Sequence, residues 1–353
     1  MPLNRLYPIL ICVCTILVGM LPSQAQESPP TQVQSAAPDN LPDLSIPAGG
    51  NLQQVKAVVK KAKAIQPKNG NQYKAMQTAI RDGSERILSL LQNDKDSADY
   101  RQAELDTITA SVSLMAFGSP DAQKKTLEQI QSFLKSRKTL SLQDVQTGIM
   151  AATMLELQPN KRPARSIYEL LDELLKDDKR EEMQAFRVNL KASVRRLALL
   201  GEKMDMEAKT IKGKKIAVKD FEGKFLIIDF FASWCKPCLE ETPRLKGHYQ
   251  KYRSKGLEVI GVSVDQKRES LDKHLKKTKL PWPVIHDLAD NPLDTLQIKY
   301  GISQLPTVLL INKEGTVVSL EARGAELDRL MQMLFEKPTL APPKEDLRDD
   351  SKK

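Results

Sequence analysis

The sequence predicts two domains of different class: an all-α N-terminal domain and a C-terminal α/β domain with a mixed sheet. The length of 353 residues allows two domains with tails. Over residues 51–203, apolar residues recur at helical spacing, which indicates a helical bundle or an array of helical hairpins. Over residues 204–338, strand-length apolar runs alternate with helical patterns and end in a hairpin.

The chain begins with a segment typical of a signal peptide, residues 1–25. Arg5 precedes an apolar stretch over residues 6–21, and Ser23-Gln24-Ala25 has the small-x-small spacing of a cleavage site. The stretch is too short to favour a transmembrane span, although an uncleaved anchor is the alternative. We therefore expect export to the periplasm or cell envelope.

Two further segments have the composition of disordered chain. Residues 26–50 are rich in Pro, Gln, Ser and Ala and predict a flexible linker. Residues 339–353 are charged and contain prolines, which predicts a disordered tail.

The segment 51–203 predicts six or seven amphipathic helices. Leu52, Val55 and Val59 share one helical face, and Ser119-Pro120-Asp121 is a helix start with a capping oxygen and a proline at the first position. No repeat of fixed period and no catalytic constellation is present in the sequence of this segment. We expect it to bind an unidentified protein partner.

The net charge of +9 raises the question of nucleic-acid binding. The lysines are spread along helices and aromatic residues make up only 5%, so no basic stripe with stacking residues is present in the sequence. We expect no nucleic-acid partner. The charge instead favours acidic partners or an anionic membrane surface.

The sequence of the C-terminal domain predicts both strands and helices. The sequence predicts strands at 216–218, 225–231 and 257–264, a helix at 268–277, and a hairpin of strands 307–311 and 316–320. A helix over 239–252 follows the second strand and a helix over 325–335 ends the domain.

Of the four cysteines, Cys12 and Cys14 fall in the predicted signal peptide, which leaves Cys235 and Cys238. A buried-strand pattern followed by Cys-x-x-Cys and a helix places Cys235 at a helix N-terminus. The partial positive charge there stabilises a thiolate, and the second thiol resolves a mixed disulfide. The pattern predicts thiol–disulfide chemistry.

Other uses of the two cysteines are less favoured. A structural zinc site needs four ligands, and His248, His274 and His286 show no ligand spacing. The absence of His after Cys238 excludes c-type haem attachment there. A structural disulfide across two residues would constrain the unfolded chain little. We expect no metal and no cofactor.

Asp229 lies mid-strand among apolar residues, six positions before Cys235. A lone acid in such surroundings has a raised pKa, which suits a base working near neutral pH. The alternative is an acid at a strand end that reaches solvent. We favour the functional interpretation.

Residues 230–238, Phe-Phe-Ala-Ser-Trp-Cys-Lys-Pro-Cys, resemble the thioredoxin-like active site, and more narrowly that of the exported TlpA/ResA branch. Glu241 and Pro243 fit that branch's Cys-x-x-Glu-x-Pro extension. Residues 301–307 resemble the segment that carries the family's cis-proline, and Gly324 resembles a glycine lining the same groove. The resemblance covers residues 201–338 and implies a thioredoxin-like fold.

The resemblance also implies roles around the cysteines. Cys235 would be the exposed attacking thiol and Cys238 the buried resolving thiol. Lys236 would lower the pKa of the attacking thiol, and Pro237 would fix the first helical turn. Trp234 would shield one side of the sulfurs.

Three further roles follow from the same resemblance. Leu305-Pro306 would be a cis peptide whose backbone groups face a bound substrate strand. Gly324 would line that groove. Asp229 matches the buried carboxylate of thioredoxin, which takes the proton of the resolving cysteine.

The leading functional hypothesis is an exported thiol–disulfide oxidoreductase that reduces disulfides in client proteins and receives electrons from a membrane or periplasmic donor. The alternatives are a disulfide oxidase or isomerase, or a helical adaptor with a thioredoxin-like docking module. Peroxidase activity is disfavoured because Ala232 stands where thiol peroxidases need Thr or Ser.

Overall fold

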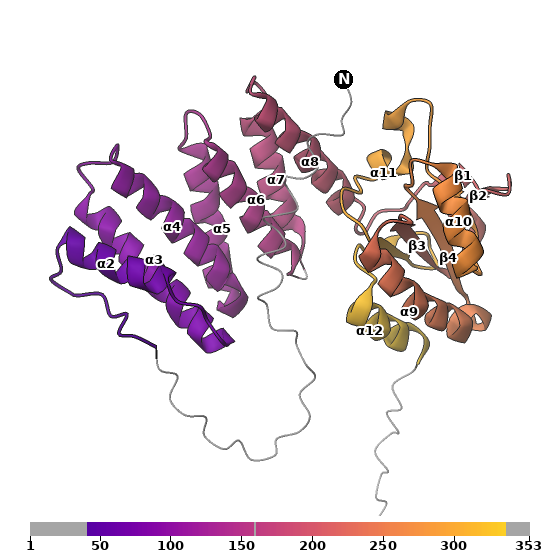
Figure 1. Cartoon of the computed structure of the whole chain (residues 1–353), viewed down its shortest axis with the longest axis horizontal. Coiled ribbons are helices and arrows are strands. Elements are labelled where there is room, and N and C mark those ends of the chain that lie inside the picture. The colour runs from indigo at the N-terminus through magenta and orange to yellow at the C-terminus, as the bar shows by residue number, and fades with distance from the viewer. Residues whose placement is uncertain (1–40, 159, 337–353) are drawn as a thin grey trace, which may run out of the picture. The chain divides into compact units, whose positions relative to one another are not determined.

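A computed structural model describes residues 41–158 and 160–336 (Figure 1). The predicted signal peptide, most of the predicted linker and the predicted tail lie outside the described residues. The chain divides into two compact units between Leu157 and Gln158. We call them the N-terminal and C-terminal units and describe each by itself. In the described part of the chain, no helix combines the length and apolar character needed to cross a membrane.

The N-terminal unit is helical, as the sequence predicts. Its helices are α2 (Leu52–Lys63), α3 (Gly70–Leu90), α4 (Ala98–Leu114), α5 (Pro120–Lys135) and α6 (Leu142–Glu156), with a short 3-10 turn η2 (Met115–Phe117). Helix α3 packs extensively against its sequence neighbours α2 and α4, as in a hairpin array. Apolar contacts join Val55 and Val59 of α2 with Ile87 and Ala103 of the next two helices.

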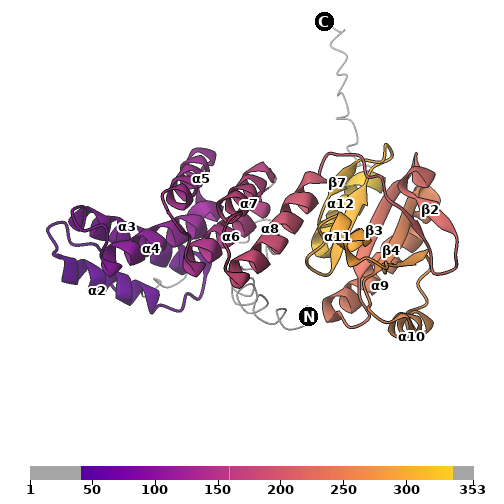
Figure 2. The same cartoon turned by 90° about the horizontal axis from the view of Figure 1, so that it is seen from above.

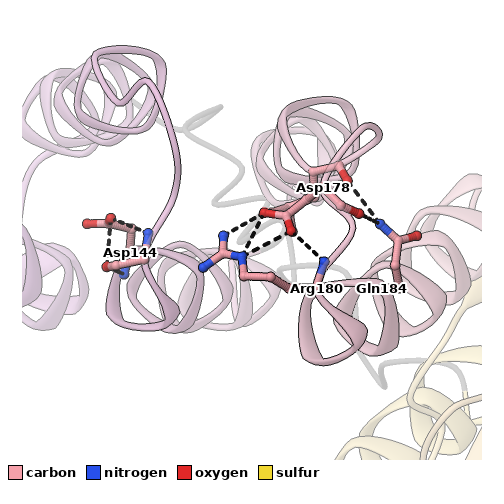
Figure 3. A network of polar contacts seen from close by, with 6 residues as sticks. Asp144, Asp178, Arg180 and Gln184 are labelled. Atoms are coloured by element: carbon pink, nitrogen blue, oxygen red, sulfur yellow. Dashed lines mark hydrogen bonds and ion pairs between the residues drawn. The ribbon is translucent and has the colours of Figure 1, made fainter.

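Polar side chains define where these helices begin. Ser141 caps α6 in a reciprocal arrangement, in which Asp144 N–H donates to Ser141 Oγ at 3.1 Å. In return, the N–H and the hydroxyl of Ser141 both donate to Asp144 Oδ2 at 2.8 Å. Figure 3 labels Asp144 with its polar contacts, on the left. Such a cap satisfies backbone donors that the first helical turn leaves unpaired.

The C-terminal unit starts with a helical hairpin, α7 (Arg162–Leu174) and α8 (Glu181–Ala198). Its turn is fixed by Asp178, whose carboxylate accepts the backbone N–H of Arg180 at 2.9 Å and also binds its guanidinium. The side-chain amide of Gln184 donates to the carbonyl groups of Leu175 and Asp178. Figure 3 shows Asp178, Arg180 and Gln184 in contact.

The division of the chain lies earlier than the domain boundary we predicted at 203/204. The segment after α8 pairs with the edge of the sheet: Gly201 N–H donates to Val317 O at 2.9 Å, and Val317 N–H donates to Glu202 O at 3.0 Å. Gly301 approaches α8 so closely that a Cβ on it would lie 2.1 Å from Ala192 O. These long-range contacts group α7 and α8 with the sheet, and helical periodicity cannot reveal them.

The sheet has five strands in the order β5-β4-β3-β6-β7. They are β3 (Phe225–Phe231), β4 (Leu257–Ser263), β5 (Val284–His286), β6 (Thr307–Ile311) and β7 (Val317–Ser319). Strand β3 is central, parallel to β4 and antiparallel to β6. A separate hairpin joins β1 (Glu207–Lys209) and β2 (Lys215–Ala217). The predicted mixed α/β sheet is confirmed, and β5 is a strand that the sequence analysis did not predict.

Three helices cover one face of this sheet: α9 (Lys236–Tyr252), α10 (Arg268–Thr278) and α12 (Gly324–Phe335). Helices α9 and α10 share a face because the crossovers β3–α9–β4 and β4–α10–β5 step in the same direction along the sheet. Ile227 of β3 packs there with Leu245, Leu271 and Leu327. Figures 1 and 2 show α9 and α12 near β3.

The other face of β3 is buried as well, with Leu226, Ile228 and Phe230 at most 1% exposed. A strand buried on both faces has a continuous apolar sequence. This explains the unbroken run over residues 225–231, interrupted only by Asp229.

Candidate active site

The two cysteines lie where the central strand gives way to helix α9. Cys235 is the N-cap of α9, and its Sγ accepts the N–H of Cys238 at 3.3 Å. The two sulfurs are joined in a disulfide with a Cα–Cα distance of 5.3 Å. The predicted strand–Cys-x-x-Cys–helix arrangement is therefore confirmed. Unpaired N–H groups at a helix start favour negative charge, so they would stabilise a Cys235 thiolate.

The expectation of an exposed attacking thiol is wrong for this disulfide-bonded form. Cys235 is 5% exposed and Cys238 is 4% exposed. Both residues belong to the apolar cluster that includes Phe231, Ala232 and Val308.

Trp234 and Lys236 form the solvent-facing part of the motif. The Trp234 residue is 70% exposed, and the Lys236 side chain is 87% exposed. The Lys236 ammonium lies 3.9 Å from the carboxylate of Glu240. Solvent and this neighbour screen its charge, so we expect Lys236 to stabilise the thiolate less than the helix N–H groups do.

The predicted cis peptide is present at Leu305-Pro306. Strand β6 begins at the next residue, Thr307, whose Cα partner on β3 is Phe230. Because the two strands are antiparallel, the start of β6 lies beside the end of β3. This register places Pro306 next to the segment that leads to the cysteines, and Leu305 packs against their apolar cluster.

Gly324 is connected to the active-site helix by a hydrogen bond. Its backbone N–H donates to Glu241 Oε1 at 2.8 Å, and its φ of +57° lies in the left-handed region. Glu241 is one turn after Cys238 on α9, so this contact ties the start of α12 to the helix that carries the redox pair.

Asp229 is buried, as the sequence predicts, with 9% of the residue exposed. Asp229 and Ile227 are two residues apart on β3, so their side chains lie on the same face of the sheet. Ile227 packs in the cluster on the face that α9 covers. Burial raises the pKa of Asp229 to about 7, and the negative charge of Glu241 adds to the rise. The interpretation as a strand-end acid in solvent is thus disfavoured, while a role in proton transfer stays a prediction.

Asp265 is a residue of this site that the sequence analysis did not select. It follows β4, and its carboxylate accepts both the N–H and the hydroxyl of Ser233, at 3.0 and 2.6 Å. Ser233 lies 32 residues away in sequence, in the turn before Cys235. The available signal was an acid directly after the apolar strand predicted at 257–264.

The histidines occupy separate positions. His248 Nε2 lies 2.7 Å from Asp328, His286 Nε2 bonds the carbonyl of Asp265, and His274 packs against Phe231. Within residues 41–158 and 160–336, no group of three or more His, Cys, Asp or Glu side chains is placed to hold a metal ion.

Comparison with known proteins places this site in a family. The family model for AhpC/TSA matches residues 200–320. The thiol–disulfide oxidoreductase ResA of Bacillus thuringiensis subsp. konkukian is 35% identical over 129 residues, which are 36% of this chain and 72% of that protein. The chain belongs to the ResA-type thiol–disulfide oxidoreductases. The resemblance drawn from residues 230–238 is therefore confirmed.

Two further proteins are similar to part of this chain. ResA of Bacillus subtilis is 34% identical over 108 residues, 31% of this chain and 58% of that protein. Among solved structures, the thioredoxin domain of a Bacteroides vulgatus thiol–disulfide oxidoreductase is 28% identical, with 38% of this chain and 95% of that chain covered and a TM-score of 0.35. The AhpC/TSA family model covers only residues 200–320, so the helices α2 to α8 lie outside it.

Proposed function

We propose that this protein is an exported thiol–disulfide oxidoreductase that reduces disulfides in extracytoplasmic client proteins. One observation carries the proposal: a complete Cys235–Cys238 pair at the start of α9, beside a cis Leu305-Pro306 peptide, in a ResA-type domain. The signal-peptide pattern of residues 1–25 supports export.

The proposed reaction consumes one client disulfide per turnover. The Cys235 thiolate attacks a client sulfur, which breaks the client S–S bond and forms a mixed disulfide. The thiolate of Cys238 then attacks the Cys235 sulfur, and the client leaves with both of its cysteines reduced. The client gains two electrons and two protons, and the enzyme ends as the Cys235–Cys238 disulfide that the structure contains.

Asp229 is the proposed proton acceptor for the second step. Its pKa of about 7 leaves it partly ionised near neutral pH, so it would take a proton from the Cys238 thiol without holding it permanently. Its side chain belongs to the face of β3 that α9 covers, which is the helix that carries Cys238.

The return of the enzyme to its dithiol form requires an electron donor. A reduced dithiol of a membrane or periplasmic partner would exchange with the Cys235–Cys238 disulfide and supply two electrons. The oxidase alternative runs the same exchange in the other direction, and the isomerase alternative returns a client with a rearranged disulfide and no net transfer of electrons. The Lys-Pro pair between the cysteines is closer to that of reducing relatives, which favours the reductase direction.

The reduction potential of the mature full-length protein tests the direction. A value near that of thioredoxin, about −270 mV, supports a reductase, and a value near that of DsbA, about −120 mV, overturns it. A Cys235→Ser variant is the control and should not cycle. If the unaltered pair does not cycle either, the oxidoreductase proposal fails as a whole.

For the N-terminal unit we propose binding of an acidic segment of a partner protein. A hollow of about 490 Å³ lies between α3 and α5, with Lys74, Arg81 and Lys125 around apolar Met115 and Phe117. Phe117 is 44% exposed. Glu85 also lines the hollow and Arg81 is paired with Asp82 at 2.7 Å, so the attraction for an acidic ligand rests mainly on Lys74 and Lys125. Charge complementarity therefore favours an acidic ligand.

A labelled hexaglutamate peptide tests this hollow by fluorescence anisotropy on the full chain. Reversing charge at Lys74 and Lys125 should weaken binding several-fold. The matched control reverses Lys60 and Lys68, which are exposed lysines outside the hollow. An equal loss of peptide affinity in both variants would show that binding depends only on the net charge of the chain and not on the hollow.

A further inference from the structure

The turn that leads to the reactive cysteine is anchored to the neighbouring strand by one side chain. The carboxylate of Asp265 accepts the N–H of Ser233 with both oxygens, at 3.2 and 3.0 Å. The Ser233 hydroxyl donates to Oδ1 of the same carboxylate at 2.6 Å. The hydroxyl of Ser263, the last residue of β4, donates to Oδ2 at 2.8 Å. The carboxylate is thus fully used as an acceptor.

Asp265 is itself held firmly in place. It is 1% exposed, and its N–H donates to the Ser263 hydroxyl oxygen at 3.2 Å. Its backbone carbonyl accepts Nε2–H of His286, on β5, at 2.7 Å. The preceding residue, Val264, continues the pairing with β3 by donating its N–H to Phe231 O at 2.9 Å. The acid therefore has the rigid support of two strands.

This anchor acts on the position of Cys235. The N–H of Cys235 donates to Ala232 O at 3.1 Å, which closes the turn around Ser233. The same turn presents Cys235 Sγ to the N–H of Cys238. If Ser233 is released, the turn is free to rotate, and the sulfur loses its fixed place at the start of α9. Small displacements of a reacting atom cost large factors in rate.

We propose that Asp265 is a positioning residue for the attacking thiol: through Ser233 it fixes the turn that sets Cys235 on the first N–H groups of α9. The inference rests on the proposed function, because it assigns Asp265 a part in the same thiol–disulfide reaction. Asp265 does not touch the reacting atoms and is not itself a catalytic residue.

The chain offers a matched control in its other unit. Asp144 is also buried, at 6% exposed, and it also accepts the N–H and the hydroxyl of a serine, Ser141 (Figure 3). An Asp144→Asn variant makes the same carboxylate-to-amide change at a place that carries no cysteine, where the carboxylate also lies 3.6 Å from Arg137. It therefore reports what such a contact contributes to stability alone.

The measurement is the rate at which the reduced full-length protein attacks a small aromatic disulfide, followed by release of the coloured thiol. This probe needs no client protein and no electron donor. We expect Asp265→Asn to slow the attack by about 10- to 100-fold, while Asp144→Asn lowers the unfolding midpoint and leaves the rate within about twofold. Ser233→Ala removes one of the contacts and should slow the attack by a smaller factor.

A double variant shows whether Asp265 acts through Ser233. Ser233→Ala combined with Asp265→Asn should be about as slow as Asp265→Asn alone, because residues in one network are not additive. Independent, multiplying losses would overturn the proposal. So would a faster attack by Asp265→Asn, since that would mean the carboxylate acts only by repelling the thiolate.

Two outcomes separate this inference from the proposed function. If the unaltered reduced protein does not react with the probe, the oxidoreductase proposal fails. If it reacts and Asp265→Asn matches Asp144→Asn, only the positioning role fails. Should Asp265→Asn not fold, the Ser233→Ala variant decides, and an unchanged rate in that variant overturns the inference.

Discussion

Glu241 Oε1 accepts the backbone N–H of Gly324 at 2.8 Å, which joins the active-site helix α9 to the first residue of α12. The same carboxylate is one of the two causes that raise the pKa of buried Asp229. One side chain thus joins the start of α12 to α9 and contributes to the raised pKa of Asp229.

Replacing Glu241 by Gln separates these two effects. The amide oxygen still accepts the N–H of Gly324, while the negative charge is gone. We expect the pKa of Asp229 to fall, by less than the part that burial contributes, because burial is the larger cause. The acidic limb of the pH–rate profile for disulfide reduction should move to lower pH. An unchanged profile would mean that Asp229 does not titrate in the rate-limiting step.

Asp229→Asn should make the protein more stable at alkaline pH. The folded-state pKa of Asp229 is about 7, against 3.8 for the unperturbed group, so burial of its ionised form opposes folding. Below about pH 3, the acid is protonated in both states, and the two proteins differ little. As pH rises to 7, only the unfolded chain releases the proton, and the unaltered protein loses stability that the Asn variant keeps.

The gain should level off above pH 7 at no more than about 4 kcal/mol. Urea unfolding at pH 5, 7 and 9 measures it. The same variant should reduce client disulfides more slowly, because Cys238 loses its proton acceptor. Equal stability of the two proteins at pH 9 would contradict the burial of an ionisable carboxyl.

Variants of the two cysteines should differ in whether a mixed disulfide with the client accumulates. With Cys238→Ser, no thiolate is present to attack the Cys235 sulfur, so a covalent client complex should accumulate. With Cys235→Ser, no such complex should form. Non-reducing mass spectrometry of each variant after reaction with a disulfide-bonded peptide identifies the adduct. An adduct on Cys238 in the second variant would reverse the assigned order.

Gly301→Ala should destabilise the protein more than an alanine at another glycine of positive φ. Its Cβ would lie 2.1 Å from Ala192 O, whereas a Cβ on Gly213, with φ +82°, would have nothing within 4 Å. Gly213→Ala should cost about 1–2 kcal/mol for its backbone conformation alone. Gly301→Ala should cost that amount and about 1–3 kcal/mol more for the displaced helix. Similar urea midpoints for Gly301→Ala and Gly213→Ala would show that α8 can shift to make room for the added methyl group at little cost in stability.

Much of the site follows from local sequence. The apolar run 225–231 predicts a strand buried on both faces, and Cys-x-x-Cys before a helical pattern predicts the capped start of α9. The cis peptide at Leu305-Pro306 follows from the family resemblance of residues 301–307. These features depend on neighbours in sequence, or on a motif that retains its spacing.

The rest depends on contacts between distant segments. Cys235 is buried in a cluster with Val308, which lies more than 70 residues later in the sequence. Ser233 and Asp265 are 32 residues apart, so neither residue alone reveals the contact. The place of α8 depends on the absence of a side chain at Gly301. Periodicity describes one face of one element and gives no information about its partner.

The pairing of residues 201–204 with β7 determines how far this protein can be shortened. A truncated protein that begins at residue 204 would lack Gly201 and Glu202, which occupy the Val317 carbonyl and N–H. The outer edge of β7 would then present unpaired backbone groups to other molecules, and such edges promote intermolecular strand pairing. A soluble fragment for biophysical work should therefore retain residues 201–203, and the close approach of Gly301 to Ala192 is a reason to keep α8 with its partner α7 as well.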